Sequence, residues 1–267
     1  MRERKTVQAG EITQKEYGWL LKQPYMTTDQ EKVMKNFEKE NPAEVIDEKP
    51  VLITKPLVWR YFKLAYKIET GEEFKETDDS LANIGVIINY FVKNPDFFKS
   101  SNLVNQVGRS RLKPSFSKGL LVIGTYGNGK TTIMRALSRL FNHFELPMRY
   151  KSVNAHDVVT EYETLETPGD KFLFYERYKC KGLYIDDVKK EATASNYGKK
   201  EILRAILEKR YDNGLKTYIT CNFREGDASE DVPDAMSEFG ERYGEHIYDR
   251  LFKMFNIIQF KGGSFRN

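Results

Sequence analysis

A glycine-rich stretch that ends in a lysine is the part of this sequence best suited to chemistry. The run GTYGNGKTT fits the pattern G-x-x-x-x-G-K-[ST], follows an apolar strand and opens an amphipathic helix. Glycines let backbone N–H groups turn inward toward phosphate oxygens, and the helix N-terminus adds partial positive charge. In such a loop Lys130 neutralises the outer phosphates of ATP, and the Thr131 hydroxyl binds Mg²⁺. The predicted phosphate-binding residues are Gly124, Thr125, Tyr126, Gly127, Asn128, Gly129, Lys130, Thr131 and Thr132.

Two adjacent carboxylates follow a second apolar run. Asp186 and Asp187 come directly after Gly182-Leu183-Tyr184-Ile185. A carboxylate at such a strand end can hold Mg²⁺, and its neighbour can orient an attacking water. We assign Asp186 to the metal and Asp187 to catalysis. Paired acids are also common at solvated strand ends, and the phosphate loop favours the functional interpretation over that one.

A polar side chain ends a third apolar run. Asn222 follows residues 217–221, and its amide could hydrogen-bond the attacking water or the terminal phosphate. The alternative is that Asn222 only begins a turn, a position where asparagine is frequent. We predict a catalytic role beside Asp187.

The elements that must position these residues alternate between strand and helix. From residue 119 onward, short apolar runs are separated by amphipathic segments, which indicates an α/β fold with a parallel sheet sandwiched by helices. The expected strands are 120–123, 150–153, 183–185 and 218–220, and the expected helices are 131–144, 155–165 and 199–211.

The first part of the chain has a different character. Residues 1–75 are expected to form a small, mainly helical region, with a short helix after Thr27 and a proline-containing linker at 41–56. Helical spacing is also expected at 57–68, and a capped helix from about residue 78 to 92. We place an ATPase domain at residues 76–267.

Composition narrows the class of protein only a little. The net charge of +4 permits contact with nucleic acid without requiring it. Cys180 and Cys221 lack the spacing of a disulfide framework or a zinc site. No apolar run is long enough to cross a membrane, and the first residues are too polar for a signal peptide. These features favour a cytoplasmic protein with no membrane partner.

The order of these motifs resembles the AAA+ superfamily. More narrowly, the sequence resembles DnaC/DnaI-type replicative helicase loaders and the related IstB-type transposition ATPases, over about residues 78–267. The matching stretches are GTYGNGKTT, GLYIDDV, NYGKKEILRAILEKRYDNGLKTYITCNF and YGEHIYDRL, with SFR near the end.

The resemblance implies roles for two arginines. Arg250, in IYDRL, matches an arginine finger that reaches the terminal phosphate held by a neighbouring subunit, so catalysis would require self-association. Arg266, in SFR, matches a second sensor that contacts nucleotide in its own subunit. The simpler alternatives are a solvent-facing charge on a helix for Arg250 and a loose chain end for Arg266.

The resemblance also implies a contact with single-stranded DNA. A tyrosine in the matching segment can stack on a base while lysines follow the phosphates. The candidate residues are Ser195, Tyr197, Lys199 and Lys200. The alternative for the two lysines is a solvated helix start.

Three departures from the family pattern qualify the comparison. His246 stands where loaders often carry another arginine, so this sequence lacks one of the arginines expected at the contact between subunits. Asp187 replaces the glutamate of many AAA+ motors and suggests slow, switch-like hydrolysis. Residues 1–75 match neither family.

The function expected from these features is that of an ATP-dependent helicase loader in DNA replication. It would act on a hexameric helicase, or a related protein of the DNA machinery, bound through the N-terminal region. Three alternatives stay open at this point: an IstB-like transposition helper, a small-molecule kinase, and a binding module that holds ATP only as a structural ligand.

Overall fold

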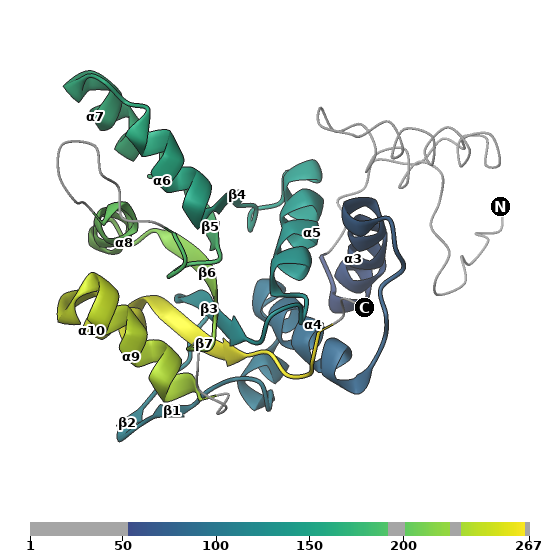
Figure 1. Ribbon diagram of the computed structural model, residues 1–267. Coiled ribbons are helices and arrows are strands. Elements are labelled where there is room, and N and C mark those ends of the chain that lie inside the picture. The colour runs from purple at the N-terminus through teal and green to yellow at the C-terminus, as the bar shows by residue number, and fades with distance from the viewer. Residues whose placement is uncertain (1–52, 192–200, 225–230, 265–267) are drawn as a thin grey trace, which may run out of the picture.

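A five-stranded parallel sheet forms the centre of the computed structural model (Figure 1). The structure describes residues 53–191, 201–224 and 231–264. The strand order is β4-β5-β6-β3-β7, and each neighbouring pair is parallel. The strands are β3 (Gly119–Gly124), β4 (Lys151–Asn154), β5 (Gly182–Asp186), β6 (Lys216–Asn222) and β7 (Phe255–Gln259). Because all five strands run the same way, their carboxyl ends meet at one edge.

Helices cover both faces of this sheet, as Figure 1 shows. One face carries α3 (Lys55–Thr70), α4 (Asp78–Phe91) and α5 (Lys130–His143). The other face carries α6 (Ala155–Glu163), α7 (Pro168–Arg177), α8 (Ile202–Asp212), α9 (Val232–Tyr243) and α10 (Glu245–Met254). A short helix, η1 (Pro95–Lys99), and a hairpin of β1 (Gln106–Val107) and β2 (Ser110–Arg111) precede the sheet.

The alternation of side chains along β3 creates two separate hydrophobic clusters. Leu120 and Val122 pack toward α3, α4 and α5, whereas Leu121 and Ile123 pack toward the opposite layer. All four side chains are fully buried, as expected for a central strand of a parallel sheet. The predicted fold, an α/β P-loop sheet sandwiched by helices, is confirmed.

The first described helix, α3, also belongs to this core. α3 contributes Phe62 and Ala65 to the cluster that contains α4 and α5. An ion pair of 3.0 Å between Glu69 and Arg139 joins α3 to α5. The division of the chain at residue 75 stays a prediction, and the helix expected after Thr27 lies outside the described residues.

Several elements differ from the sequence-based expectations. The helix expected at 199–211 is described over Ile202–Asp212, and the strand expected at 150–153 spans Lys151–Asn154. Tyr150 lies outside the strand, and its backbone carbonyl accepts from the side chains of Ser138 and Asn142 on α5, at 3.0 and 2.7 Å. The elements α7, α9 and β7 were not predicted. None of the described helices is long and apolar enough to span a membrane.

Candidate nucleotide-binding site

The predicted phosphate loop lies at the carboxyl edge of the sheet, between β3 and α5. Gly127 and Gly129 have positive φ angles of 76° and 87°, a region that glycine enters without strain. A Cβ atom at Gly127 would also lie 3.0 Å from the Cβ of Ser264, so the close approach of the C-terminal segment excludes a side chain there. The strand–loop–helix context that the motif requires is therefore present.

Lys130 braces the loop from inside. Its ammonium group donates to the carbonyls of Gly124 and Thr125 at 2.8 and 2.6 Å. It also donates to the side-chain oxygens of Asn128 and Asn222, at 3.2 and 3.0 Å. Burial lowers the pKa of Lys130 to about 8, because removal from water disfavours the charged form. This cation sits where phosphate oxygens could replace neutral carbonyl partners.

The predicted metal residues are brought together. The Thr131 hydroxyl donates to Oδ1 of Asp186 at 2.9 Å. The same oxygen accepts from the hydroxyls of Tyr184 and Thr220, at 2.6 and 2.7 Å. Arg135 donates to the other carboxylate oxygen at 3.2 Å. Asp186 is therefore buried but fully hydrogen-bonded, and its position is fixed by two strands and a helix.

This pair of oxygen ligands fits Mg²⁺. No cluster of three His, Cys, Asp or Glu side chains occurs within the described ranges. Mg²⁺ does not need one, since it is commonly held by one or two protein oxygens together with substrate phosphates and waters. Thr131 and Asp186 could supply such a pair beside the loop.

The predicted catalytic residues also meet. The side-chain nitrogen of Asn222 donates to Oδ1 of Asp187 at 3.0 Å, while its oxygen accepts from Lys130. Asp187 has a positive φ of 55°. Its turn is held because the N–H groups of Asp187 and Val188 donate to the side chain and carbonyl of Thr220, at 3.2 and 2.9 Å. A continuous polar chain thus runs from Lys130 through Asn222 to Asp187.

Arg250 is not brought to this site. It lies on α10, where its guanidinium is 4.8 Å from the centroid of the Tyr211 ring and 3.8 Å from a carboxylate oxygen of Asp212. Those two residues end α8, shortly before the amino end of β6. The phosphate loop follows the carboxyl end of β3, which is parallel to β6. Arg250 therefore lies toward the opposite edge of the sheet from the loop of its own chain.

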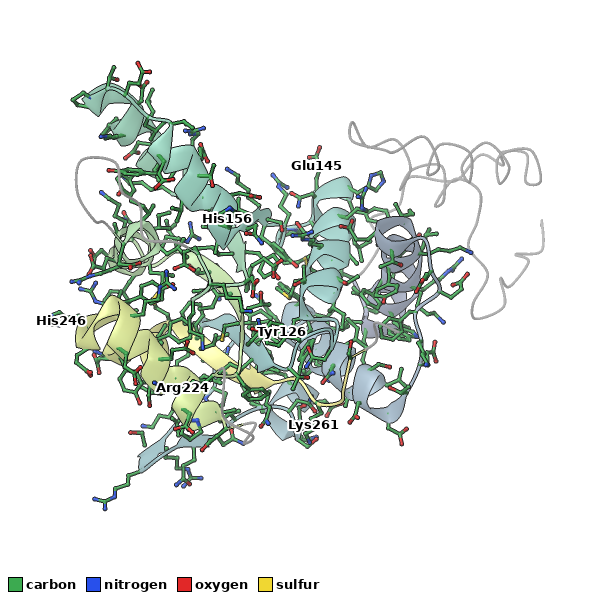
Figure 2. All side chains as sticks on the ribbon, in the orientation of Figure 1. Tyr126, Glu145, His156, Arg224, His246 and Lys261 are labelled. Carbon is green, nitrogen blue, oxygen red and sulfur yellow. The ribbon has the colours of Figure 1, made fainter. Side chains whose placement is uncertain are left out.

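Other predicted residues fall outside this geometry or outside the described ranges. His246 is exposed on α10, and Figure 2 shows it far from Tyr126. The second predicted sensor and the predicted DNA contacts lie outside the described residues: Arg266, Ser195, Tyr197, Lys199 and Lys200.

Sequence reasoning missed several residues that support the site. Tyr184 carried a usable signal, because residues two apart on a strand share a face and Asp186 follows at that spacing. Lys189 and Arg242 carried no usable sequence signal, because only the folded chain brings α9 next to the segment after β5.

The fold and the loop together define an α/β P-loop protein. No protein-family model matches the sequence, and no curated protein matches it. Among solved structures, the DnaC helicase loader is 18% identical, with a TM-score of 0.49, over 72% of this chain and 96% of DnaC. DnaI is 16% identical, with a TM-score of 0.48, over 76% of this chain and 93% of DnaI.

A third solved structure is AMPPCP-bound DnaA from Aquifex aeolicus. It is 16% identical, with a TM-score of 0.40, over 70% of this chain and 48% of DnaA. These solved structures include DnaC and DnaI, the two proteins whose type the sequence motifs resemble. Identities this low concern the fold alone, so what those proteins bind or load is not carried over to this chain.

Proposed function

We propose that this chain binds ATP with Mg²⁺ and hydrolyses it. The observation that carries the proposal is the polar chain from Lys130 through Asn222 to Asp187, beside the pair of Thr131 and Asp186. These are the groups needed to hold phosphates, place a metal ion and orient water, and they converge at the carboxyl edge of the sheet.

Phosphate binding would exchange the partners of Lys130. Its bonds to the Gly124 and Thr125 carbonyls would give way to bonds with phosphate oxygens, which are stronger because both partners are charged. When bound, Mg²⁺ supplies positive charge that offsets the charge of the outer phosphates. Thr131 and Asp186 would hold it, and Arg135 keeps the Asp186 carboxylate oriented.

Asp187 and Asn222 would orient the attacking water. Their mutual hydrogen bond fixes both side chains at the ends of neighbouring strands. The Asp187 carboxylate can accept a proton from water, and the Asn222 amide can hold the water or the terminal phosphate. The short aspartate side chain fits slow turnover.

We further propose that Arg250 completes the site of a second copy of this chain. It lies toward the edge of the sheet away from its own phosphate loop, so catalytic contact would be made between copies. An arginine supplied from outside stabilises the charge that develops during phosphoryl transfer.

Arg266 would contact nucleotide within the same chain. The segment that leads to it lies against the phosphate loop: the Thr125 hydroxyl donates to the Gly262 carbonyl at 3.1 Å. Ser264 approaches Gly127 closely. These contacts support the assignment because Arg266 follows Ser264 by two residues.

The biological role that we propose is loading of a hexameric helicase in DNA replication. Its support is the resemblance of the motifs to DnaC/DnaI-type loaders. Residues 1–75 would bind the helicase, and Ser195, Tyr197, Lys199 and Lys200 would contact single-stranded DNA. ATP binding would favour assembly and DNA binding, and hydrolysis would release the DNA.

The test is ATP turnover by the purified full chain, with and without single-stranded DNA and over a range of protein concentrations. Release of inorganic phosphate without any acceptor molecule is expected, with a rate per chain that rises with concentration. Lys130→Ala should lose both binding and turnover. A turnover rate that depends on neither DNA nor protein concentration would contradict a helicase loader that acts as an assembly. Phosphate transfer to a small molecule would identify a kinase.

The partner is tested separately with a purified hexameric helicase. The full chain is expected to co-elute with the helicase in ATP and Mg²⁺, and removal of residues 1–52, which leaves α3 and its core contacts in place, should abolish this. Co-elution that survives the removal would overturn the assignment of the N-terminal region.

A further inference from the structure

A lysine outside every predicted motif lies next to the phosphate loop. The Nζ atom of Lys190 is 3.9 Å from the centroid of the Tyr126 ring. Tyr126 is the third residue of the loop, and its side chain is 51% exposed. Lys190 is exposed as well. This contact therefore lies at the open side of the loop and is not part of the packed core (Figure 2 labels Tyr126).

Lys190 and Lys130 are close enough to interact electrostatically. The positive charge of Lys190 adds to the lowering of the pKa of Lys130, although burial is the largest cause. Asp186 and Asp187 act on Lys130 in the opposite direction. Lys190 thus lies within the same electrostatic environment as the phosphate-binding lysine.

The backbone on both sides of Lys190 is fixed. The two terminal nitrogens of Arg242 donate to the carbonyls of Lys189 and Glu191, so one guanidinium spans the three-residue segment. The Glu191 side chain is buried and accepts from the Tyr243 hydroxyl. Both neighbours are held toward α9, which leaves Lys190 on the exposed side.

Lys189 strengthens this anchoring. It has a positive φ of 83°, a strained conformation for a residue other than glycine that persists only when its surroundings enforce it. Its Nζ donates to the carbonyls of Asn222 and Ala235, at 3.1 and 3.3 Å, and to the Glu238 carboxylate. The segment after Asp187 is therefore built to hold one conformation.

We propose that Lys190 is a second cation of the nucleotide site. When a nucleoside triphosphate binds, the Lys190 ammonium moves away from the Tyr126 ring and bonds the terminal phosphate. The inference rests on the proposed ATP-binding function. The terminal phosphate is the partner because Lys190 follows closely after Asp187, the residue proposed to face the water that attacks that phosphate. A phosphate oxygen is a much stronger partner for an ammonium than an aromatic face, which supports this exchange.

The consequence is discrimination between triphosphate and diphosphate. Lys130 and the loop N–H groups would serve both nucleotides, whereas Lys190 would bond only the phosphate that ADP lacks. Loss of Lys190 should therefore weaken ATP binding selectively, and loss of Lys130 should weaken both.

The experiment measures ADP and β,γ-methylene-ATP binding by calorimetry, with Mg²⁺, on the full chain. Lys190→Met is expected to lower the affinity for the triphosphate analogue about tenfold to a hundredfold, the range of one charge-assisted bond. ADP affinity should stay within about twofold. Lys190→Arg should restore most of the difference, because it keeps the positive charge.

Lys181→Met is the matched control, since Lys181 is an exposed lysine just before β5 and should leave both affinities unchanged. Thermal unfolding without nucleotide should be the same for all these variants. An unchanged ratio of the two affinities in Lys190→Met would overturn the inference while ATP binding by the wild type still stands. A wild-type chain that binds neither nucleotide would overturn the proposed function and this inference together.

Discussion

The side-chain amide of Asn222 donates to the carboxylate of Asp187 at 3.0 Å, across two neighbouring strands. The same amide accepts from Lys130 through its oxygen. Asn222 thus connects the residue proposed to bind phosphate with the residue proposed to orient water. Replacing it should separate binding from turnover.

We expect Asn222→Ala to reduce the ATP turnover number about a hundredfold, the typical effect of losing a positioned catalytic group. Nucleotide affinity should change little, because the loop and three of the four partners of Lys130 remain. Single-turnover kinetics and equilibrium binding measure the two quantities. Asn213→Ala is the control, since Asn213 is exposed at the end of α8 and should leave both unchanged. A parallel loss of affinity and turnover would show that Asn222 acts only through Lys130.

Lys130 should make nucleotide binding depend on pH in the alkaline range. Burial places its pKa at about 8, and phosphate binding favours the charged form, so its pKa should be higher in the complex. Below this pKa the amine is already protonated and binding takes up little proton. Above it, binding takes up as much as one proton, and affinity should fall by as much as about tenfold per pH unit.

Calorimetry at pH 9 in buffers of different ionisation enthalpy measures this uptake. Lys130→Arg keeps a permanent charge and should show no comparable uptake, although its affinity will be lower. The charges of Asp186, Asp187 and Lys190 also act on Lys130. The proton uptake due to Lys130 is therefore taken as the difference in uptake between the wild type and Lys130→Arg. Equal proton uptake by the wild type and Lys130→Arg would contradict the assignment of this pH dependence to Lys130.

Arg250 should act between copies of the chain. Arg250→Ala is expected to bind ATP normally and to lose nearly all turnover, while Lys130→Ala loses binding. When the two inactive variants are mixed, some contacts pair an intact Arg250 with an intact phosphate loop, and turnover should return in part. Steady-state phosphate release against the mixing ratio measures this recovery.

The control for that mixture is Lys253→Ala, which removes an exposed cation from the same helix and should keep full turnover alone. Arg250→Ala that remains active would show that the guanidinium serves only its contact with Tyr211 and Asp212. A mixture that never recovers would contradict action between copies.

Arg210 should matter for stability and not for nucleotide binding. Its fully buried guanidinium donates to the carbonyls of Tyr178, Cys180 and Lys216 and to the Thr217 hydroxyl. Arg210→Met leaves these acceptors unpaired, and we expect the free energy of unfolding to fall by about 2–4 kcal/mol.

Urea unfolding measures this difference. Lys209→Met, at the exposed neighbouring position, should change the free energy of unfolding by about 0.5 kcal/mol or less. Nucleotide affinity should be unchanged in both variants at temperatures where they are folded. Equal stabilities of the two variants would contradict this role of Arg210.

The sequence was informative where a local pattern and a local structure coincide. The phosphate loop, the buried strands β3, β5 and β6, and the pairing of Thr131 with Asp186 all follow from motif and periodicity. Each of these residues lies at a strand end or a helix start, and parallel strands bring such ends to one edge.

The elements that were missed depend on contacts distant in sequence. β7 begins at Phe255 directly after α10 ends at Met254, with no turn residue between them to mark the change. Its identity as a strand comes from pairing with β3, where Ile257 lies opposite Leu121. The anchoring of Lys189 by α9 likewise joins segments whose proximity only the folded chain creates.

The opposite locations of the phosphate loop and Arg250 would restrict how copies of this chain assemble through the proposed contact. A contact in which the arginine of one copy meets the loop of the next joins two different surfaces, which makes the interface heterologous. Each added copy then still presents one unused loop or one unused arginine, so the contact can be repeated. Depending on the rotation between neighbours, such repetition closes into a ring or continues as a helical filament, and one end copy of an open filament would hold its nucleotide without an arginine opposite.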